Sequence, residues 1–168
     1  PDGDAFYASR LRDFTTTNLT PEAIHQAGLA NVARLHEEMR SVMAELVEEG
    51  ELSAFLDQVR NDESLRYDNT EAGRSAYLDA ARTAIDRMAE RLPDYFGLLP
   101  QSDLIVKRVE AYREQSAGKA FYQSPPPDGS RPGIYYANLY DLNSMPTTDL
   151  EALAFHEGLP GHHLQLSI

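Results

Sequence analysis

The feature that most restricts the fold is a helix break, Gly158-Leu159-Pro160-Gly161, near the end of the 168-residue chain. Pro160 has no N–H to donate to the carbonyl of His156, and its ring clashes with that carbonyl in a continuous helix. The two glycines accept backbone torsions that other residues avoid. A helix that includes His156 must therefore end or bulge before it reaches His162.

The residues on both sides of this break have a pattern that is typical of zinc hydrolases. His156 is followed at once by Glu157, and His162 and His163 come after the break. In the HExxH pattern, two histidines four residues apart bind one zinc ion, and the glutamate takes a proton from the metal-bound water. Neutral imidazoles bind the metal in this chemistry, and the carboxylate acts as the general base.

The spacing differs from HExxH, because six and seven residues separate His156 from His162 and His163. On an unbroken helix, six residues turn the second ring by about 240°, and seven move it roughly 10 Å along the axis. A loop of about two extra residues would return His162 to the place of the second ligand. His156 and His162 are thus the predicted zinc ligands, and His163 is the alternate or additional one. Glu157 is the predicted general base.

A helix that follows Thr147 and Thr148 is predicted to carry His156 and Glu157 side by side. Thr147 or Thr148 is the expected N-cap, since threonine side chains accept hydrogen bonds from the first free backbone N–H groups. Asp149 and Glu151 place negative charge in the first turn, where the helix dipole favours it. Either carboxylate is also a candidate to support a metal-binding histidine.

Composition excludes several classes of protein. The net charge of −12 argues against nucleic acid as a partner and against binding to an anionic membrane surface. No apolar run is long enough to span a membrane. The absence of cysteine leaves histidine, aspartate and glutamate as the strong metal ligands.

The first 100 residues are predicted to be helical, with helices over residues 4–14, 20–49, 52–59 and 70–91. Thr20-Pro21 is a typical helix start, and Gly50 is the expected end of the second helix. Apolar side chains recur along that helix at spacings of three and four, which predicts a seam that packs against other helices. The seam consists of Ile24, Gly28, Val32, Leu35, Met39, Val42 and Leu46.

Strand-forming runs rich in β-branched and aromatic residues follow: LIVKRV, FYQSP and GIYYANLY. They predict a small antiparallel sheet just before the helix that carries His156. Residues 134–139 are the predicted edge strand that would pair with an extended substrate. The predicted substrate-binding residues are Tyr135, Tyr136, Ala137 and Asn138. Adjacent tyrosines point to opposite faces, so at most one can polarise a scissile carbonyl, and ordinary sheet packing is the alternative for both.

Three stretches resemble one bacterial family, that of domain of unknown function 885: HEGLPGHHLQ, YYANLYDL and PDGDAFYASRLRDFTTTNLTPEAIHQAGL. The resemblance implies a zincin-type metallopeptidase of the mostly helical, gluzincin-like kind. It also implies that the chain continues past Ile168 into an EGWA-type segment whose glutamate is the third zinc ligand. We therefore expect this sequence to be a fragment that is inactive alone.

The sequence thus predicts an α+β fold, mostly α-helical and gluzincin-like, with the small antiparallel sheet beside the metal-binding helix. We expect one incomplete domain over residues 1–168, with a helical part (1–100), a β part (101–146) and the metal-binding helix (147–168). The predicted function is Zn²⁺-dependent cleavage of peptides. The alternative is a non-catalytic protein of the same fold that binds metal or peptide. Peptide specificity, the physiological metal, the oligomeric state and the compartment, whether cell envelope or cytoplasm, stay open.

Overall fold

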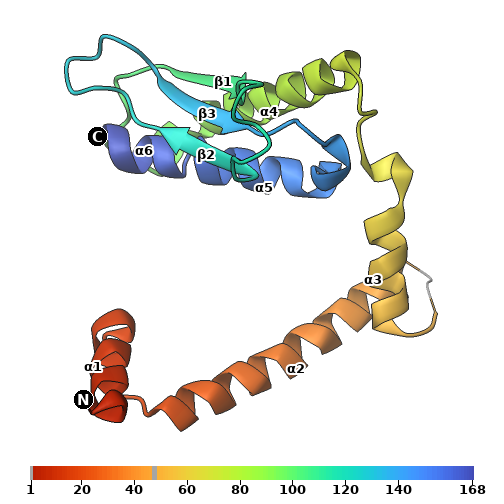
Figure 1. Cartoon of the computed structure of the whole chain (residues 1–168), viewed down its shortest axis with the longest axis vertical. Helices are drawn as coiled ribbons and strands as arrows, with labels where there is room; N and C mark the ends of the chain where they lie inside the picture. Colours follow the sequence, from red (N-terminus) through yellow and green to blue (C-terminus); the bar gives the residue numbers. More distant parts are fainter. Residues whose placement is uncertain (1, 47–48) are drawn as a thin grey trace. The chain divides into compact units, whose positions relative to one another are not determined.

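The computed structural model of the chain describes residues 2–46 and 49–168. They divide into two compact units, unit 1 (Pro1–Asn61) and unit 2 (Asp62–Ile168), which follow one another along the colour bar of Figure 1. The regular elements described in unit 1 are helices, whereas unit 2 combines helices with a three-stranded sheet. The fold is therefore α+β and mostly helical, as predicted.

Unit 1 contains α1 (Gly3–Thr15), α2 (Pro21–Glu45) and α3 (Leu52–Asn61). The side chains of Asp2 and Thr20 cap the first two helices by accepting from the backbone N–H three residues ahead. The Thr-Pro helix start predicted from the sequence is thus confirmed. The predicted end of the second helix falls partly on residues 47–48, which lie outside the described residues.

The apolar seam of α2 is exposed in unit 1. Its large exposed side chains are Val32, Leu35, Met39, Val42 and Leu46. Within residues 2–46 and 49–61, the buried hydrophobic side chains are Met43 and Leu52. A helix seam is buried only where another element covers it, so the prediction that this seam packs against other helices is wrong for unit 1.

Unit 2 is built on α4 (Glu71–Arg91), whose N-cap is Thr70, the first residue of the helix predicted over residues 70–91. The side of this helix that faces the core consists of Tyr77, Ala81, Ala84 and Ile85. The short 3₁₀ helices of the unit are η1 (Glu63–Leu65), η2 (Leu92–Asp94) and η3 (Leu142–Ser144). Pro93 lies in η2 and ends the long helix where the sequence predicts.

The sheet contains β1 (Leu104–Arg108), β2 (Ala120–Gln123) and β3 (Gly133–Ala137), in the order β1-β3-β2. β3 is parallel to β1 and antiparallel to β2, so the sheet is mixed and the predicted antiparallel sheet is wrong. Every residue of β3 is buried, and a strand buried on both faces favours the centre of a sheet, where both of its edges pair. β3 therefore lies between β1 and β2 in the sheet, although β2 precedes it in the sequence.

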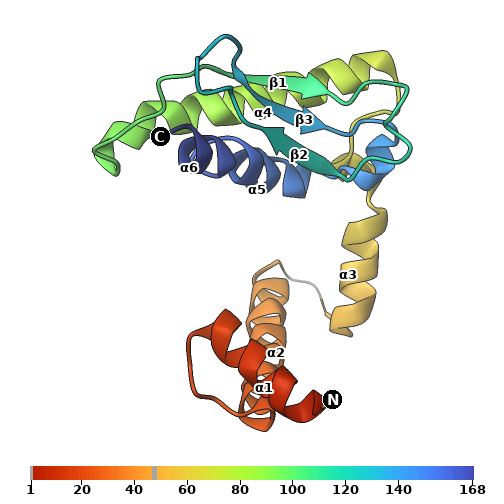
Figure 2. The same ribbon diagram turned by 60° about the vertical axis from the view of Figure 1, so that its left-hand side comes forward.

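Helices α4 and α5 (Thr147–Glu157) cover one face of this sheet. The core between them contains, among others, Val106, Tyr135, Ala137, Leu150 and Ala154. A smaller cluster of Val109, Ile134 and Tyr136 lies on the other face. Figure 2 shows α5 and α6 (His162–Ser167) along the β2 side of the sheet, which places the helix break beside this strand.

Across residues 2–46 and 49–168, no helix combines the length and the apolar character that crossing a bilayer requires.

Candidate metal centre

Helix α5 begins at Thr147, earlier than either predicted N-cap residue would allow. Its N-cap is Pro146, in extended backbone, and not Thr147 or Thr148. The hydroxyl of Thr147 instead donates to the carbonyl of Leu65, 3.2 Å away, so this side chain makes a tertiary contact in place of a cap. The helix is consequently anchored at its start to the segment that precedes α4.

The two acidic residues of this helix's first turns form ion pairs. Asp149 pairs with Lys119 at 2.8 Å, and Glu151 pairs with Arg87. Among the described residues, neither carboxylate hydrogen-bonds to a histidine. The prediction that one of them supports a metal ligand therefore finds no contact in this structure.

The helix break folds the backbone back on the end of α5. The N–H of Gly161 donates to the carbonyl of Phe155 at 2.9 Å, and the Leu159–Pro160 peptide bond is cis. A Cβ atom on Gly161 would lie 1.9 Å from the carbonyl oxygen of His156, which only glycine avoids. This close return is what brings His162 back beside the end of α5.

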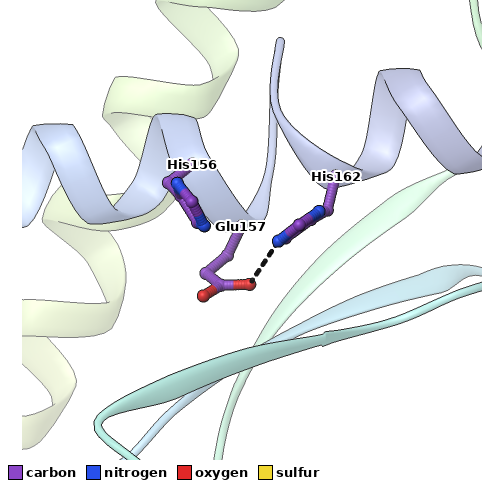
Figure 3. A group of neighbouring side chains, drawn as sticks. All are labelled: His156, Glu157 and His162. Atoms are coloured by element: carbon purple, nitrogen blue, oxygen red, sulfur yellow. Dashed lines mark ion pairs between the residues drawn. The ribbon is translucent and has the colours of Figure 1, made fainter. Parts of the chain in front are cut away.

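His156, Glu157 and His162 converge from the two sides of the break, as Figure 3 shows. One candidate ligand atom from each residue lies within 4.8 Å of the others. The two imidazole rings meet edge to face with centroids 4.8 Å apart. Nε2 of His162 lies 3.9 Å from a carboxylate oxygen of Glu157. This is the single group of three or more potential metal ligands found in the described part of the chain.

The donor set suits zinc. Imidazole nitrogens are common zinc ligands, and in a tetrahedral site with bonds of about 2.1 Å two ligand atoms lie about 3.4 Å apart. The separation here is wider by an amount that side-chain rotation can close. His156 is exposed and the side chain of His162 is 39% exposed, so both have room to rotate. Glu157 is buried, which holds its carboxylate under the two rings.

His163, the alternate ligand of the sequence analysis, points elsewhere. Its side chain is buried, and both ring nitrogens are engaged. Nε2 lies 3.0 Å from the carbonyl oxygen of Ser102, and Nδ1 lies 2.8 Å from the hydroxyl of Tyr122. Burial lowers the pKa of the imidazole, and the hydrogen bond to the Ser102 carbonyl opposes this in part. The geometry therefore separates His163 from the cluster that contains His162.

The predicted substrate-binding residues do not lie on an edge strand. Tyr135, Tyr136 and Ala137 belong to β3, which pairs with a neighbour on each side. The side chain of Asn138 donates to backbone carbonyls of residues 114, 117 and 118. The prediction of an edge strand over residues 134–139 is therefore wrong, because the most apolar strand occupies the centre of the sheet. These four residues have no free backbone edge to offer a peptide.

Of these four residues, Tyr135 is the one that interacts electrostatically with Glu157, although its side chain is fully buried. Its hydroxyl makes no hydrogen bond of normal geometry among the described residues. Burial raises the pKa of this phenol, and the neighbouring Tyr77 and Glu157 act in the same direction. Its side chain thus lies within the core, near Glu157, and is closed to a substrate.

The strand beside the cluster is β2, which occurs at one end of the sheet order and pairs only with β3 among the described strands. A groove of about 500 Å³ lies between the start of β2 and α5. It is lined by Lys119, Ala120, Thr148, Asp149, Ala152, Leu153, His156 and Glu157. A larger cavity of about 870 Å³, beside residues 125–132, includes no member of the histidine–glutamate cluster.

Sequence reasoning therefore missed the contribution of β2. Its FYQ segment was recognised as a strand, but nothing in its pattern places it at the edge. The signal that could have indicated this is the polar residue at each end of the segment, Lys119 before β2 and Gln123 as its last residue, whereas β3 has no charged or amide side chain.

Comparison with known proteins shows a bacterial family and a solved structure that this chain is similar to. The family model described as "Bacterial protein of unknown function (DUF885)" matches residues 1–168. The search among curated proteins gave no match. A crystal structure of a protein from Colwellia psychrerythraea, provisionally described as a lipoprotein, is similar with a TM-score of 0.88 and 30% sequence identity. The similarity covers 99% of this chain and 29% of that chain, so the chain spans less than a third of this relative's length.

Proposed function

This chain belongs to the bacterial family DUF885 over residues 1–168, and from that premise we propose that it functions as a zinc-dependent hydrolase of peptide bonds, of the gluzincin-like kind. The observation that carries the proposal is the convergence of two histidines and a glutamate across a helix break, with ligand atoms within 4.8 Å. A His-Glu pair on an ordinary helix would have no second histidine at that position. Gly161 supports a specific arrangement, because the backbone returns so close to the His156 carbonyl that only glycine fits at this position.

In this proposal His156 and His162 hold the zinc ion. Bound zinc supplies a Lewis acid and lowers the pKa of its water towards 7. Glu157 would serve as the general base, because its buried carboxylate lies beside His162 and forms no hydrogen bond to another described residue. The resemblance to the family adds a third ligand, a glutamate, that is not among residues 1–168.

The substrate would lie in the groove between β2 and α5. An extended peptide can add to the free edge of β2 by backbone hydrogen bonds, which position it without regard to sequence. Ala120, Ala152 and Leu153 give this groove an apolar floor that leads towards Glu157. In this proposal the strand that pairs with the substrate is thus residues 120–123 and not residues 134–139.

The test is zinc content and peptide hydrolysis measured together, in a protein that extends past Ile168 as the family resemblance implies. His156→Ala and His162→Ala should each lose bound zinc, whereas His36→Ala, an exposed histidine on α2, should keep it. Glu157→Gln should keep zinc and lose on the order of 10²–10⁴ in hydrolysis rate, the usual contribution of acid–base catalysis. Unchanged zinc content in both histidine variants would overturn the metal site.

The alternative, a protein of the same fold that binds metal or peptide without turnover, has a distinct outcome. In that case wild type and Glu157→Gln would bind zinc and peptide equally, and neither would hydrolyse a peptide panel. Export to the cell envelope is part of the proposal only through the Colwellia psychrerythraea relative, whose description is that of a lipoprotein.

A further inference from the structure

A chain of hydrogen bonds beside the candidate metal centre joins α6 to β2. The hydroxyl of Tyr122 lies 2.8 Å from Nδ1 of His163 and 3.2 Å from the hydroxyl of Ser167. On the other side of the His163 ring, Nε2 lies 3.0 Å from the carbonyl oxygen of Ser102. Three residues, two of them distant from His163 in sequence, thus meet around one buried imidazole.

The donors and acceptors of this chain can be assigned. A carbonyl oxygen only accepts, so Nε2 of His163 must carry the hydrogen that it shares with Ser102. In the neutral ring Nδ1 then has a lone pair and no hydrogen, so the hydroxyl of Tyr122 donates to it. The hydroxyl of Ser167 lies 3.2 Å from the oxygen of Tyr122 and 3.3 Å from Nδ1 of His163, so it can donate to either atom. The shortest contact of the group, 2.8 Å, joins the phenol to the imidazole and anchors the tyrosine ring.

Gly133 makes room for this contact. A Cβ atom at that position would lie 2.4 Å from the hydroxyl oxygen of Tyr122 and 2.7 Å from Nδ1 of His163. Any other residue at the start of β3 would separate the two groups. The sheet is thus shaped to let the phenol and the imidazole meet.

The ring of Tyr122 also contacts the other member of the histidine pair. It stacks on His162 with centroids 6.4 Å apart and an angle of 20°, and it meets His163 edge on at 5.7 Å. His156 meets the His162 ring edge to face at 4.8 Å. His162 therefore has an aromatic neighbour on each of two sides, and one of them is anchored by His163.

We propose that His163 is a positioning residue, which anchors Tyr122 so that the tyrosine ring fixes the orientation of His162 for metal binding. The two adjacent histidines then have separate tasks: His162 reaches the metal, and His163 holds the tyrosine that orients it. The inference rests on the proposed function in so far as His162 binds zinc. The orientation of His162 can also be measured without metal.

The first experiment is a zinc titration against a chromophoric chelator, with the folded state of each variant checked by circular dichroism. Tyr122→Leu and His163→Leu should weaken zinc binding by about 10–100-fold, the usual effect of losing a group that orients a ligand. His163→Asn should restore most of the affinity, because its side-chain oxygen can accept from Tyr122 as Nδ1 does. Tyr140→Leu is the matched control, since Tyr140 is a 49% exposed tyrosine of the same unit that belongs neither to the histidine–glutamate cluster nor to β2. It should leave the affinity unchanged.

The second experiment is NMR of the histidine side chains without metal. The ring nitrogens of His163 should report a neutral Nε2–H tautomer, and the His162 ring should be ordered in wild type and more mobile in Tyr122→Leu. Tyr122→Phe keeps the ring but loses the anchor, so it should give an intermediate result and serves if His163→Leu does not fold.

These measurements separate the two proposals. If wild type bound no zinc, the proposed function would fail, while an ordered His162 ring that depends on Tyr122 and His163 would still support the positioning role. If the His163 nitrogens shifted on addition of zinc as those of His162 do, His163 would be a ligand and the inference would be overturned. Unchanged affinity and unchanged His162 mobility in Tyr122→Leu and His163→Leu would overturn it as well.

Discussion

Helices α2 and α4 are both long, and both carry apolar residues at helical spacing, yet these residues have opposite environments. Among the described residues of α2, Met43 is the one that is buried, and Val32 and Val42 are 50% and 54% exposed. In α4 a whole side is buried, and Tyr77 and Ala81 are 1% and 0% exposed. The difference is the sheet of unit 2, which α4 packs against and for which unit 1 has no counterpart among its described residues.

An apolar seam is therefore necessary for the burial of one side of a helix, but it is not sufficient without another element to cover it. Most of the stability of a helix in a protein comes from packing its apolar side against other elements. We therefore expect equal substitutions to have unequal effects in the two units. Amide hydrogen exchange can measure this unit by unit, because it reports the opening of α2 separately from that of α4 and β3.

The largest difference is expected for glycine-to-alanine substitutions. Gly161→Ala places its Cβ atom 1.9 Å from the His156 carbonyl oxygen, so the break must move and unit 2 should lose about 3 kcal/mol or more. Gly28→Ala has nothing within 4 Å of its Cβ atom and lies inside α2, where alanine is favoured over glycine by about 1 kcal/mol. The free energy of opening should therefore fall in one unit and rise in the other. Equal effects in both would show that the break is not tightly packed.

A smaller difference is expected for leucine-to-alanine substitutions. Leu139 is fully buried in the core of unit 2, so Leu139→Ala should destabilise it by about 2–5 kcal/mol. Leu35 in α2 is 42% exposed, and Leu35→Ala should change stability by no more than about 0.5 kcal/mol. A large loss in Leu35→Ala would mean that the seam of α2 is buried in solution.

The smallest difference at neutral pH is expected for tyrosine-to-phenylalanine substitutions. Tyr135→Phe removes a buried hydroxyl that faces Tyr77 but makes no hydrogen bond of normal geometry among the described residues, so unit 2 should be unchanged or more stable by about 1 kcal/mol. Tyr7→Phe, at an exposed position of α1, should have no measurable effect. Peptide hydrolysis should also survive Tyr135→Phe, because the side chain is closed to substrate. A loss of turnover with the fold intact would show that this tyrosine takes part in hydrolysis.

The effect of Tyr135→Phe should grow at alkaline pH. The pKa of this phenol is raised above its ordinary value of 10.0, chiefly by burial. The unfolded chain then releases the proton at a lower pH than the folded chain does. The stability that the neutral phenol contributes is complete below about pH 10 and is lost as the pH rises above it. Wild type should therefore lose stability above about pH 10 more steeply than Tyr135→Phe, as urea unfolding at several pH values can check.

The sequence located the candidate site more successfully than the sheet around it. Gly158, Pro160 and Gly161 predicted a break after His156, and the structure has the break there with His162 returned to the end of α5. Such an effect is local, because it depends on backbone torsions and missing N–H groups within a few residues. The choice of His162 over His163 could also be argued from the length of the loop alone.

The order of the strands could not be predicted in this way. The pattern of β3 indicates a strand and its burial, but the pairing of β1 with β3 depends on which edges are free after the whole chain has folded. The position of β3 at the centre moved the expected substrate edge from residues 134–139 to β2. The same is true of Tyr122, whose importance comes from contacts with α6 across 41 residues of sequence.

The sequence by itself determined the family, the helix starts at Thr20 and Thr70, and the break that folds His156 and His162 together, because each follows from local torsion, capping or motif. Only the tertiary structure decided that the sheet is mixed, that β2 is its edge beside the site, and that His163 is buried against Tyr122. It also decided that the seam of α2 is exposed while that of α4 is covered. Burial and strand pairing depend on helices and strands that are distant in the sequence, and no local sequence pattern specifies which of them an element will contact.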